Sequence, residues 1–349
     1  MSNPPLSANL LREIRTSFGS HFQLNPLSTR LQMQDGLLVD TQGRQYGIYA
    51  HQFQAPQSLD MLQALALNCG DTAGADQGLD VEIDRAQVQA DYFRGRSEGV
   101  YLLNDVALTP KLAATLEEEK LSYIYSPCLF QKDITKSSGF LLAVRGLIEE
   151  VYAIFPDVVP QGESAREEHL VELFHPVFLI KAVINRRRVL LGSFYVSSYS
   201  NQRQRRQLQR LMLAEALSIA KEAGIEDILL SGDGNAYGWT IPYLPKSLWT
   251  LQFLPILLTH ALTAGFQKSA VNTLGNQEIK QLRSQARDFN FTLHPLTWSP
   301  TVGKGSGRFG VNFMADYAYH TGPAQCKSQV IPGIFPDNDH NAVVSTLNF

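Results

Sequence analysis

The chain has 349 residues, 44% of them hydrophobic, so it is long enough to bury a large core in one elaborated domain. Lys and Arg total 30 against 33 acidic residues, and the net charge of -3 excludes the overall basicity typical of nucleic-acid-binding proteins. Three scattered cysteines exclude a disulfide framework and a CxxC zinc cluster, and they favour a reducing compartment.

The beginning of the chain lacks the basic and apolar segments of a secretion signal. We therefore expect a cytoplasmic protein, with signal-independent secretion left open. The stretch 247–266 contains no Asp, Glu, Lys or Arg, which approaches the composition of a membrane span. It also contains Gln252, Pro255 and His260, so we expect a buried or amphipathic helix there and no transmembrane segment.

Residues 1–60 are expected to form a lead-in that packs on a main domain covering residues 61–349. The lead-in has a predicted helix over 6–18 and a predicted hairpin over 37–49, where the turn Asp40-Thr41-Gln42-Gly43 separates two extended runs. The main domain starts with a strand, a helix and a strand, at 65–68, 85–93 and 99–103.

The central and C-terminal elements alternate between helices and strands. Pro110 is typical of the first position of a helix and opens one that runs to Leu121. A second helix is predicted over 202–223, with apolar residues at helical spacing and Gly224 directly after its end. The other predicted helices are 247–265 and 278–288, and the predicted strands are 123–125, 140–144, 177–184, 189–196, 291–296, 310–319 and 342–349. The strands 177–184 and 189–196 read as an antiparallel hairpin. This order indicates α/β layers with mixed or antiparallel sheets.

Polar residues lie at the ends of several apolar strands or at the start of the last one. They are Asn68, Asp105, the pair Asp233 and Asn235, and the pair Asp339 and His340. Mg²⁺ takes carboxylate oxygens together with substrate phosphate and water, which makes Asp105 and Asp339 candidate metal ligands. Phosphoryl transfer also needs a group that activates water and donors for the developing charge. Asp233 is the candidate base, with Asn235, Asn68 and His340 as candidate donors.

A glycine-rich run, 303–310, formally fits G-x-G-x-x-G. A dinucleotide-binding loop follows a strand and opens a helix, whereas this run precedes a strand. We interpret it as a hairpin loop, with Lys304 and Arg308 as phosphate contacts if the loop reaches the site. His175, His294 and His320 are interpreted as ordinary surface or half-buried histidines.

Four ordered motifs together resemble those of the endonuclease/exonuclease/phosphatase superfamily. They are Asn68, Leu103-Asn104-Asp105, Gly232-Asp233-Gly234-Asn235 and Asn338-Asp339-His340-Asn341. The similarity covers about residues 62–349. It implies a four-layer α/β/β/α sandwich with two mixed, largely antiparallel sheets, and hydrolysis of a phosphoester that depends on Mg²⁺ or Mn²⁺.

The resemblance also implies roles for single residues. Asp105 stands where the family has its metal-binding glutamate, and Asp233 matches the aspartate that activates water. Asn235 matches the amide that contacts phosphate, while Asp339 and His340 match the final aspartate and histidine.

Two residues depart from the family pattern. Phe194, in Ser193-Phe194-Tyr195, stands at the position expected for the histidine of a Thr-His-Leu signature. Asn312 aligns with the aspartate that orients the final histidine. These departures leave three interpretations. The first is a phosphatase or phosphodiesterase with a diverged site, the second a catalytically silent binding protein, and the third a nuclease. The near-neutral charge favours a small or membrane-borne phosphoester over nucleic acid.

Overall fold

The computed structural model describes most of the predicted core. The described residues are 22–43, 45–53, 62–69, 91–96, 98–106, 108–127, 139–160, 177–184, 186–196, 203–238, 277–294, 314–331 and 340–349. The predicted helices 6–18 and 247–265 lie outside these residues. Among the described helices, none is long and apolar enough to cross a membrane.

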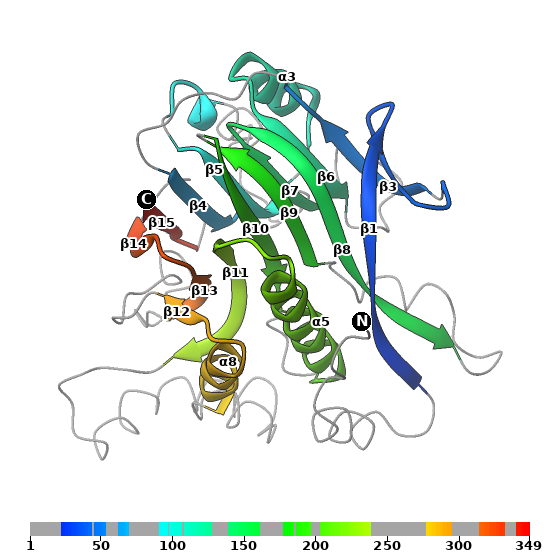
Figure 1. Cartoon of the computed structure of the whole chain (residues 1–349), viewed down its shortest axis with the longest axis vertical. Coiled ribbons are helices and arrows are strands. Elements are labelled where there is room, and N and C mark those ends of the chain that lie inside the picture. The colour runs from blue at the N-terminus through cyan, green and yellow to red at the C-terminus, as the bar shows by residue number, and fades with distance from the viewer. Residues whose placement is uncertain are drawn as a thin grey trace, which may run out of the picture.

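Fifteen strands and three helices make up the described fold (Figure 1). The strands are β1 (Phe22–Gln34), β2 (Leu37–Asp40), β3 (Gln45–His51), β4 (Leu62–Asn68), β5 (Val100–Val106), β6 (Ser122–Pro127), β7 (Gly139–Val144), β8 (Leu147–Pro160), β9 (Val177–Ile184), β10 (Arg187–Tyr195), β11 (Asp227–Gly238), β12 (Thr292–His294), β13 (Met314–Thr321), β14 (Gln325–Ile331) and β15 (Ala342–Asn348). The helices are α3 (Pro110–Glu118), α5 (Arg203–Glu222) and α8 (Gln277–Asp288).

Hydrogen bonds join all the described strands in one order, β12-β13-β11-β10-β9-β8-β1-β2-β3-β6-β7-β5-β4-β15-β14. The expected separation into two sheets is therefore not found. The physical reason lies in the first three strands: β1 pairs with β8 on one side and β2 on the other, and β3 pairs with β6. We call β12 to β8 in this order the first half, β6 to β14 the second half, and β1 to β3 the bridge.

The two halves face each other across a shared hydrophobic core. Strand β10 contacts β5, and β11 contacts β4, although neither pair is hydrogen-bonded as neighbours. The central core draws Leu191 and Leu229 from the first half and Leu102 and Ala64 from the second. Burial of such side chains is the main driving force that holds the folded-over sheet together.

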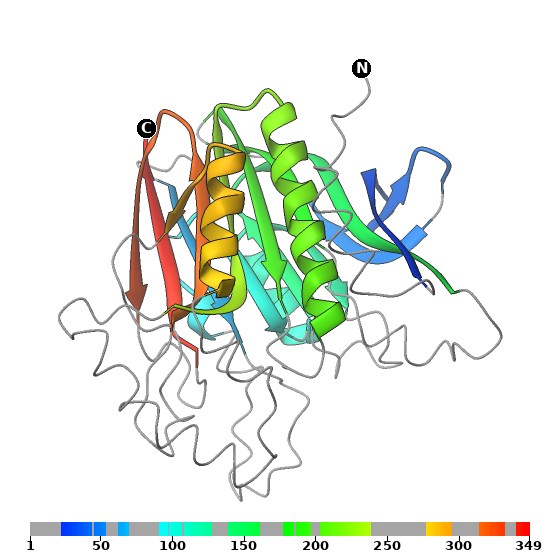
Figure 2. The same ribbon diagram turned by 90° about the horizontal axis from the view of Figure 1, so that it is seen from below.

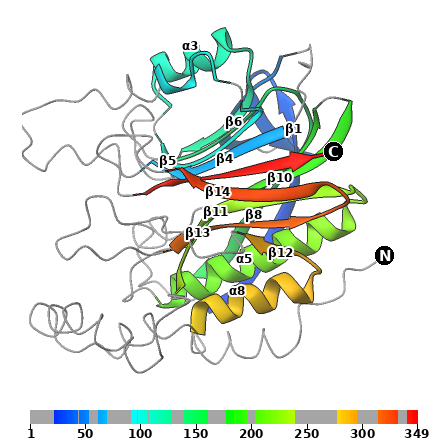
Figure 3. The same ribbon diagram turned by 90° about the vertical axis from the view of Figure 1, so that its left-hand side faces the viewer.

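Helices cover the outer faces of both halves. Leu217 of α5 and Leu282 of α8 pack with Leu230 on the outer face of the first half. Leu112 of α3 packs with Leu103 on the outer face of the second half. Figure 3 shows α3 on one side of the strands and α5 with α8 on the other, and Figure 2 shows α5 and α8 side by side. The architecture is mixed α/β with helices outside and strands within.

Local sequence explains where two of these helices begin and end. Thr109 caps α3, because its Oγ1 accepts a hydrogen bond from the Leu112 backbone N–H at 3.2 Å, and Pro110 follows directly. Helix α5 ends before Gly224, which has a positive φ of 66°. Both predicted helices are confirmed, as are the hairpins formed by β2 with β3 and by β9 with β10. The domain boundary at residue 60 stays a prediction.

Candidate active site

Strand β11 changes from apolar to polar where it nears the carboxyl end of β10. Leu229 points into the central core, and side chains alternate between the faces of a strand, so Asp233 shares that face. Asp233 is 1% exposed. An ionisable carboxyl group thus lies at the margin of the core that separates the two halves of the sheet.

A second carboxyl group lies beside the first. Asp316 of β13 is the direct register partner of Asp233 in the antiparallel β11–β13 pair, and it is 2% exposed. Directly paired residues of neighbouring strands place their side chains on the same face, a few ångströms apart. Two buried carboxylates so close repel each other unless a cation or hydrogen-bond donors compensate the charge.

His340 supplies one such partner from the other half of the sheet. It lies just before β15, is 9% exposed, and its Nδ1 is 3.0 Å from Asp316 Oδ2. An ionised carboxylate only accepts hydrogen bonds, so the proton of the imidazole is held on Nδ1, and the lone pair of the neutral ring lies on Nε2. One ligand atom from each of Asp233, Asp316 and His340 lies within 4.8 Å of the other two.

This pair corrects one expectation from the sequence. The carboxylate that orients His340 comes from Asp316 and not from the position of Asn312, which lies outside the described residues. The alternation of side chains along β13 explains why Asp316 can reach His340, because Asp316 lies on the same face as Ala318, which is part of the central core. The expected loss of the orienting aspartate is therefore wrong.

Phe194, which stands at the position expected for a site histidine, does not lie beside Asp233. Phe194 is fully buried and packs on the helix side of β10, where its ring makes an edge contact with Tyr319 at a centroid distance of 5.7 Å. The next residue, Tyr195, is half-buried, packs against the central core and is the register partner of Asp233. The side chain that lies beside Asp233 is therefore Tyr195. Sequence reasoning missed it because a shift of one residue exchanges the two faces of a strand.

Asn104 links the two halves of the sheet next to this position. Its Nδ2 donates to the Phe194 carbonyl at 3.1 Å, and its Oδ1 accepts from Ser193 Oγ at 3.1 Å. Asn104 is 1% exposed, so both bonds form away from water, where an unmet polar group is costly. The end of β10 is thereby fastened to β5. Asn104 belongs to the motif Leu103-Asn104-Asp105, but no role was predicted for it.

The structure locates the backbone of three further predicted site residues. Asn68 ends β4 and is the register partner of Asn104, and Asp105 is the next residue along β5. Asn235 lies two residues beyond Asp233 in β11. The side chains of these three residues, and the whole of Asp339 and Arg308, lie outside the described part of the structure. Of the seven predicted site residues, Asp233 and His340 are the two whose described side chains lie together.

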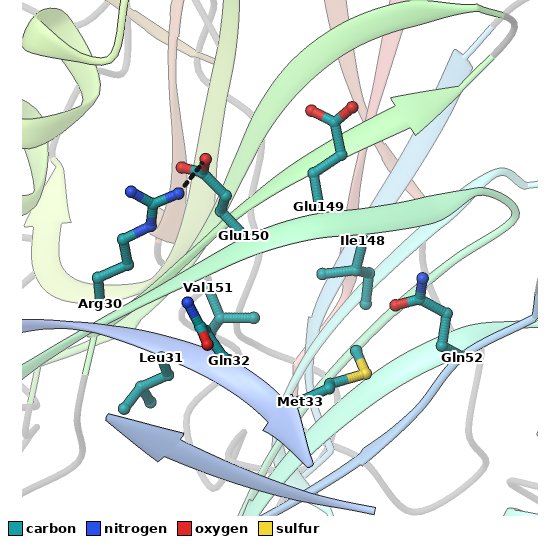
Figure 4. A pocket seen from close by; sticks show the side chains of 9 residues that line it. All are labelled: Arg30, Leu31, Gln32, Met33, Gln52, Ile148, Glu149, Glu150 and Val151. Carbon is teal, nitrogen blue, oxygen red and sulfur yellow. Dashed lines mark hydrogen bonds and ion pairs between the residues drawn. The ribbon is translucent and has the colours of Figure 1, made fainter. Parts of the chain in front are cut away.

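A pocket of about 300 Å³ lies elsewhere, between β1 and β8 (Figure 4). Arg30 forms an ion pair with Glu150, while Arg188 Nε lies 3.0 Å from an oxygen of Glu149. Charges of both signs compensate each other around this pocket, and none of Asp233, Asp316 and His340 lines it. We do not assign the candidate chemistry to it.

Comparisons with known proteins bear on the fold. No protein-family model matches the sequence, and no curated protein matches it. Solved structures do match. A crystal structure of an endonuclease/exonuclease/phosphatase family protein from Bacteroides thetaiotaomicron is 14% identical, with 82% of this chain and 97% of that chain covered and a TM-score of 0.50.

Two further structures give the same result. Mannosyl-6-phosphatase from Bacteroides thetaiotaomicron VPI-5482 is 13% identical, covers 82% of this chain and 100% of its own, and has a TM-score of 0.52. A family protein from Leptotrichia buccalis is 12% identical with the same coverage and a TM-score of 0.50. The chain has the endonuclease/exonuclease/phosphatase fold. In this fold Asp233, Asp316 and His340 come from β11, from β13 and from the residue pair before β15 begins at Ala342.

Proposed function

We propose that this protein hydrolyses a phosphoester at the Asp233 cluster, which comprises Asp233, Asp316 and His340. The supporting observation is the meeting of two buried carboxyl groups and an oriented imidazole within 4.8 Å, contributed by strands from both halves of the sheet. Buried titratable groups brought together in this way are expensive for stability and are typical of functional sites.

The chain's own residues fit a divalent cation. Asp233 and Asp316 are paired in register and almost fully buried, so their combined negative charge favours a bound cation. Carboxylate oxygens are the donors that Mg²⁺ and Mn²⁺ prefer. Under this proposal Asp105 and Asp339 would be ligands of the ion, and the buried charge of Asp233 and Asp316 would strengthen its attraction. When bound, it would stabilise charge on the phosphoryl oxygens.

In the proposed reaction Asp233 orients a water molecule and accepts its proton as the water attacks phosphorus. The P–O bond to the esterified alcohol breaks, and the leaving oxygen takes a proton from solvent. Asp316 holds the imidazole of His340 by the Nδ1 contact at 3.0 Å, so the ring keeps one orientation toward the phosphate. Asn68, Asn235 and Arg308 are the proposed donors to the phosphate oxygens, which carry increased charge in the transition state.

The corrected site weakens the alternative of a silent binding protein. That alternative depended on the loss of two groups, and Asp316 replaces one of them. At the other position, Tyr195 lies beside Asp233 and offers a phenolic hydroxyl in place of an imidazole. The site therefore differs from the family pattern at one position, where Tyr195 replaces the expected histidine, and keeps the carboxylate that orients His340.

Net charge and fold support one class of substrate over the others. The net charge of -3 supports a small or membrane-borne phosphoester over nucleic acid. A structurally similar protein is a mannosyl-6-phosphatase, which makes sugar phosphates a suitable first group to assay.

A comparison of the wild type with Asp233→Asn, in Mg²⁺ and in Mn²⁺, tests the proposal. The panel comprises a sugar phosphate, a phosphodiester, phospholipid vesicles and duplex DNA. We expect hydrolysis of one of the first three, and a decrease of about 1,000-fold or more in kcat for the variant. Asp35→Asn is the matched control, because Asp35 is exposed in the β1–β2 turn. Equal background rates for all three proteins would reject hydrolysis and favour the binding alternative, and cleavage of DNA alone would favour the nuclease.

A further inference from the structure

A second cluster of metal-binding side chains lies at the edges of the sheet, and the proposed hydrolysis does not use it. It consists of His294 of β12, His320 of β13 and Cys326 of β14, which we call the edge cluster. Strands β12 and β14 are the two ends of the hydrogen-bonded order. Figure 3 looks onto the side of the molecule where these strands lie.

The ligand atoms of the edge cluster are already close together. One ring nitrogen of each histidine and the Cys326 sulfur all lie within 4.8 Å of one another. The centroids of the two imidazole rings are 6.1 Å apart. His294 and His320 are 5% and 6% exposed, so both rings are held in place by their surroundings. Small side-chain adjustments would bring these atoms to the separations of a tetrahedral site.

One nitrogen of this cluster has no partner. His320 Nε2 is buried and accepts or donates no hydrogen bond among the described residues. An unmet polar atom in such a place costs about 1–3 kcal/mol, so native proteins rarely keep one without a role. A bound ion would satisfy it.

The turn between β13 and β14 directs the chain so that Cys326 lies close to the two histidines. Strand β13 turns into β14 through Gly322, whose positive φ of 137° and close approach to the Asp227 carboxylate leave no room for a side chain. Asp227 Oδ1 also accepts a hydrogen bond from the Ala324 backbone N–H at 2.9 Å. The turn is thus anchored on β11, and the chain after it brings the Cys326 sulfur to within 4.8 Å of a ring nitrogen of His320.

We propose that the edge cluster binds a Zn²⁺ ion, which connects the two end strands of the sheet through imidazole and thiolate ligands. Two imidazoles with one thiolate form a donor set that suits Zn²⁺, and a water molecule completes the four ligands. Binding forms a Zn–S bond and releases the thiol proton of Cys326 to solvent. The three-residue strand β12, which alone offers few hydrogen bonds, gains a direct connection to β14.

The protonation states of the histidines support this site. Burial lowers the pKa of both His294 and His320, while the nearby Asp227 carboxylate acts in the opposite direction on His320. Neutral imidazoles present the lone pair that a metal requires. Burial raises the pKa of the Cys326 thiol, so the ion has to displace a proton there.

The edge cluster is separate from the Asp233 cluster. His320 and Asp316 lie on the same strand four residues apart, which corresponds to about 13 Å along a strand. The two clusters share no residue. Their donor chemistry also differs, because the thiolate and imidazoles of the edge cluster prefer Zn²⁺, and the carboxylates favour Mg²⁺ or Mn²⁺.

Co²⁺ substitution tests the proposal, because a thiolate ligand gives a charge-transfer absorption that carboxylate ligands do not. We expect the full-length apoprotein to take up one Co²⁺ with such a band and to exchange it for Zn²⁺. Cys326→Ser should abolish the band, and His320→Gln should weaken Zn²⁺ binding by more than the roughly 10- to 100-fold cost of losing an outer-shell partner. Cys69→Ala is the control, since Cys69 is a buried cysteine that packs with β4, β5 and α3, away from the edge cluster.

A measurement on the wild type covers the case in which a variant does not fold. Zn²⁺ should slow alkylation of Cys326 at least tenfold, read by mass spectrometry of the modified peptide, and leave the rate at Cys69 unchanged. A Co²⁺ band that persists in folded Cys326→Ser, or alkylation of Cys326 that Zn²⁺ does not change, would overturn the proposal.

Discussion

His340 Nδ1 lies 3.0 Å from Asp316 Oδ2, so a histidine at the start of the last strand is held by a carboxylate from the strand beside Asp233. The contact joins residues 24 positions apart in the chain and connects the two halves of the folded-over sheet. It also places a negative charge behind the imidazole, on the side opposite to Nε2.

Asp316→Asn tests this relationship. The amide keeps the size of the side chain but carries no charge, and it can present an N–H to the ring, so the imidazole loses its fixed tautomer. We expect kcat for phosphoester hydrolysis to fall about 100-fold with KM little changed. The thermal unfolding midpoint serves as the control for folding. A variant with wild-type kcat would show that Asp316 has no part in positioning His340.

Phe194→His tests whether the sequence alignment or the strand register identifies the altered position. If Phe194 marks a lost catalytic histidine, the substitution should raise activity. We expect instead no gain, and a loss of about 3 kcal/mol in the free energy of unfolding, because an imidazole would replace a fully buried ring in the layer under α5. Urea denaturation gives the stability. In parallel, Tyr195→Phe should lower kcat about tenfold, because it removes the phenolic hydroxyl of the register partner of Asp233.

Gly232→Ala tests how closely β10 and β11 approach beside the site. A Cβ at position 232 would collide with the Phe194 carbonyl, which is backbone and has little freedom to move. We expect a loss of about 2 kcal/mol in stability and a loss of activity, because Asp233 is the next residue.

Gly224→Ala is the control for this prediction. A Cβ added at position 224 would meet no atom within 4 Å, but alanine would be strained at the positive φ found there at the end of α5. This strain should lower the free energy of unfolding by about 1 kcal/mol. Activity should be retained in Gly224→Ala, as measured with the substrate identified for the wild type. If both substitutions lowered activity equally, the loss in Gly232→Ala could not be attributed to a displacement of Asp233.

Glu215→Gln tests an electrostatic cost on α5. Burial raises the pKa of the Glu215 carboxyl above its ordinary value of about 4.5, and the Glu222 carboxylate adds to the increase. The folded state therefore holds the proton more tightly than the unfolded state, so stability falls as pH rises from about 4.5 through the raised pKa.

The variant should then be more stable than the wild type at pH 7, by less than about 1 kcal/mol for this half-buried group, and no more stable below pH 4.5. Thermal unfolding at both pH values measures the difference. Glu118→Gln, at an exposed position of α3, is the control for the effect of the substitution itself on a helix. A gain for Glu215→Gln that is equal at both pH values would contradict a titration effect.

Local patterns in the sequence determined much of the fold. Thr109 with Pro110 and the apolar spacing before Gly224 specified two helices, because capping and periodicity act within a few residues. Asp233 and His340 were identified from motifs that lie next to apolar strands. The resemblance in fold was identified as well, since the ordered motifs retain the elements around them.

Pairing between distant strands decided the rest. The sequence analysis predicted no strand for β1, β8 or β14, because β1 contains Pro26 and the exposed β14 depends on pairing with β15 for its hydrogen bonds. No local signal distinguishes Asp316 from other aspartates. It becomes a site residue because β13 pairs with β11 in a register that sets it opposite Asp233. The same long-range pairing places Tyr195, and not Phe194, beside Asp233. It also brings His294, His320 and Cys326 together. Sequence alone determined the helices and most of the other strands. The register between strands, which long-range core packing fixes, decided which side chains meet.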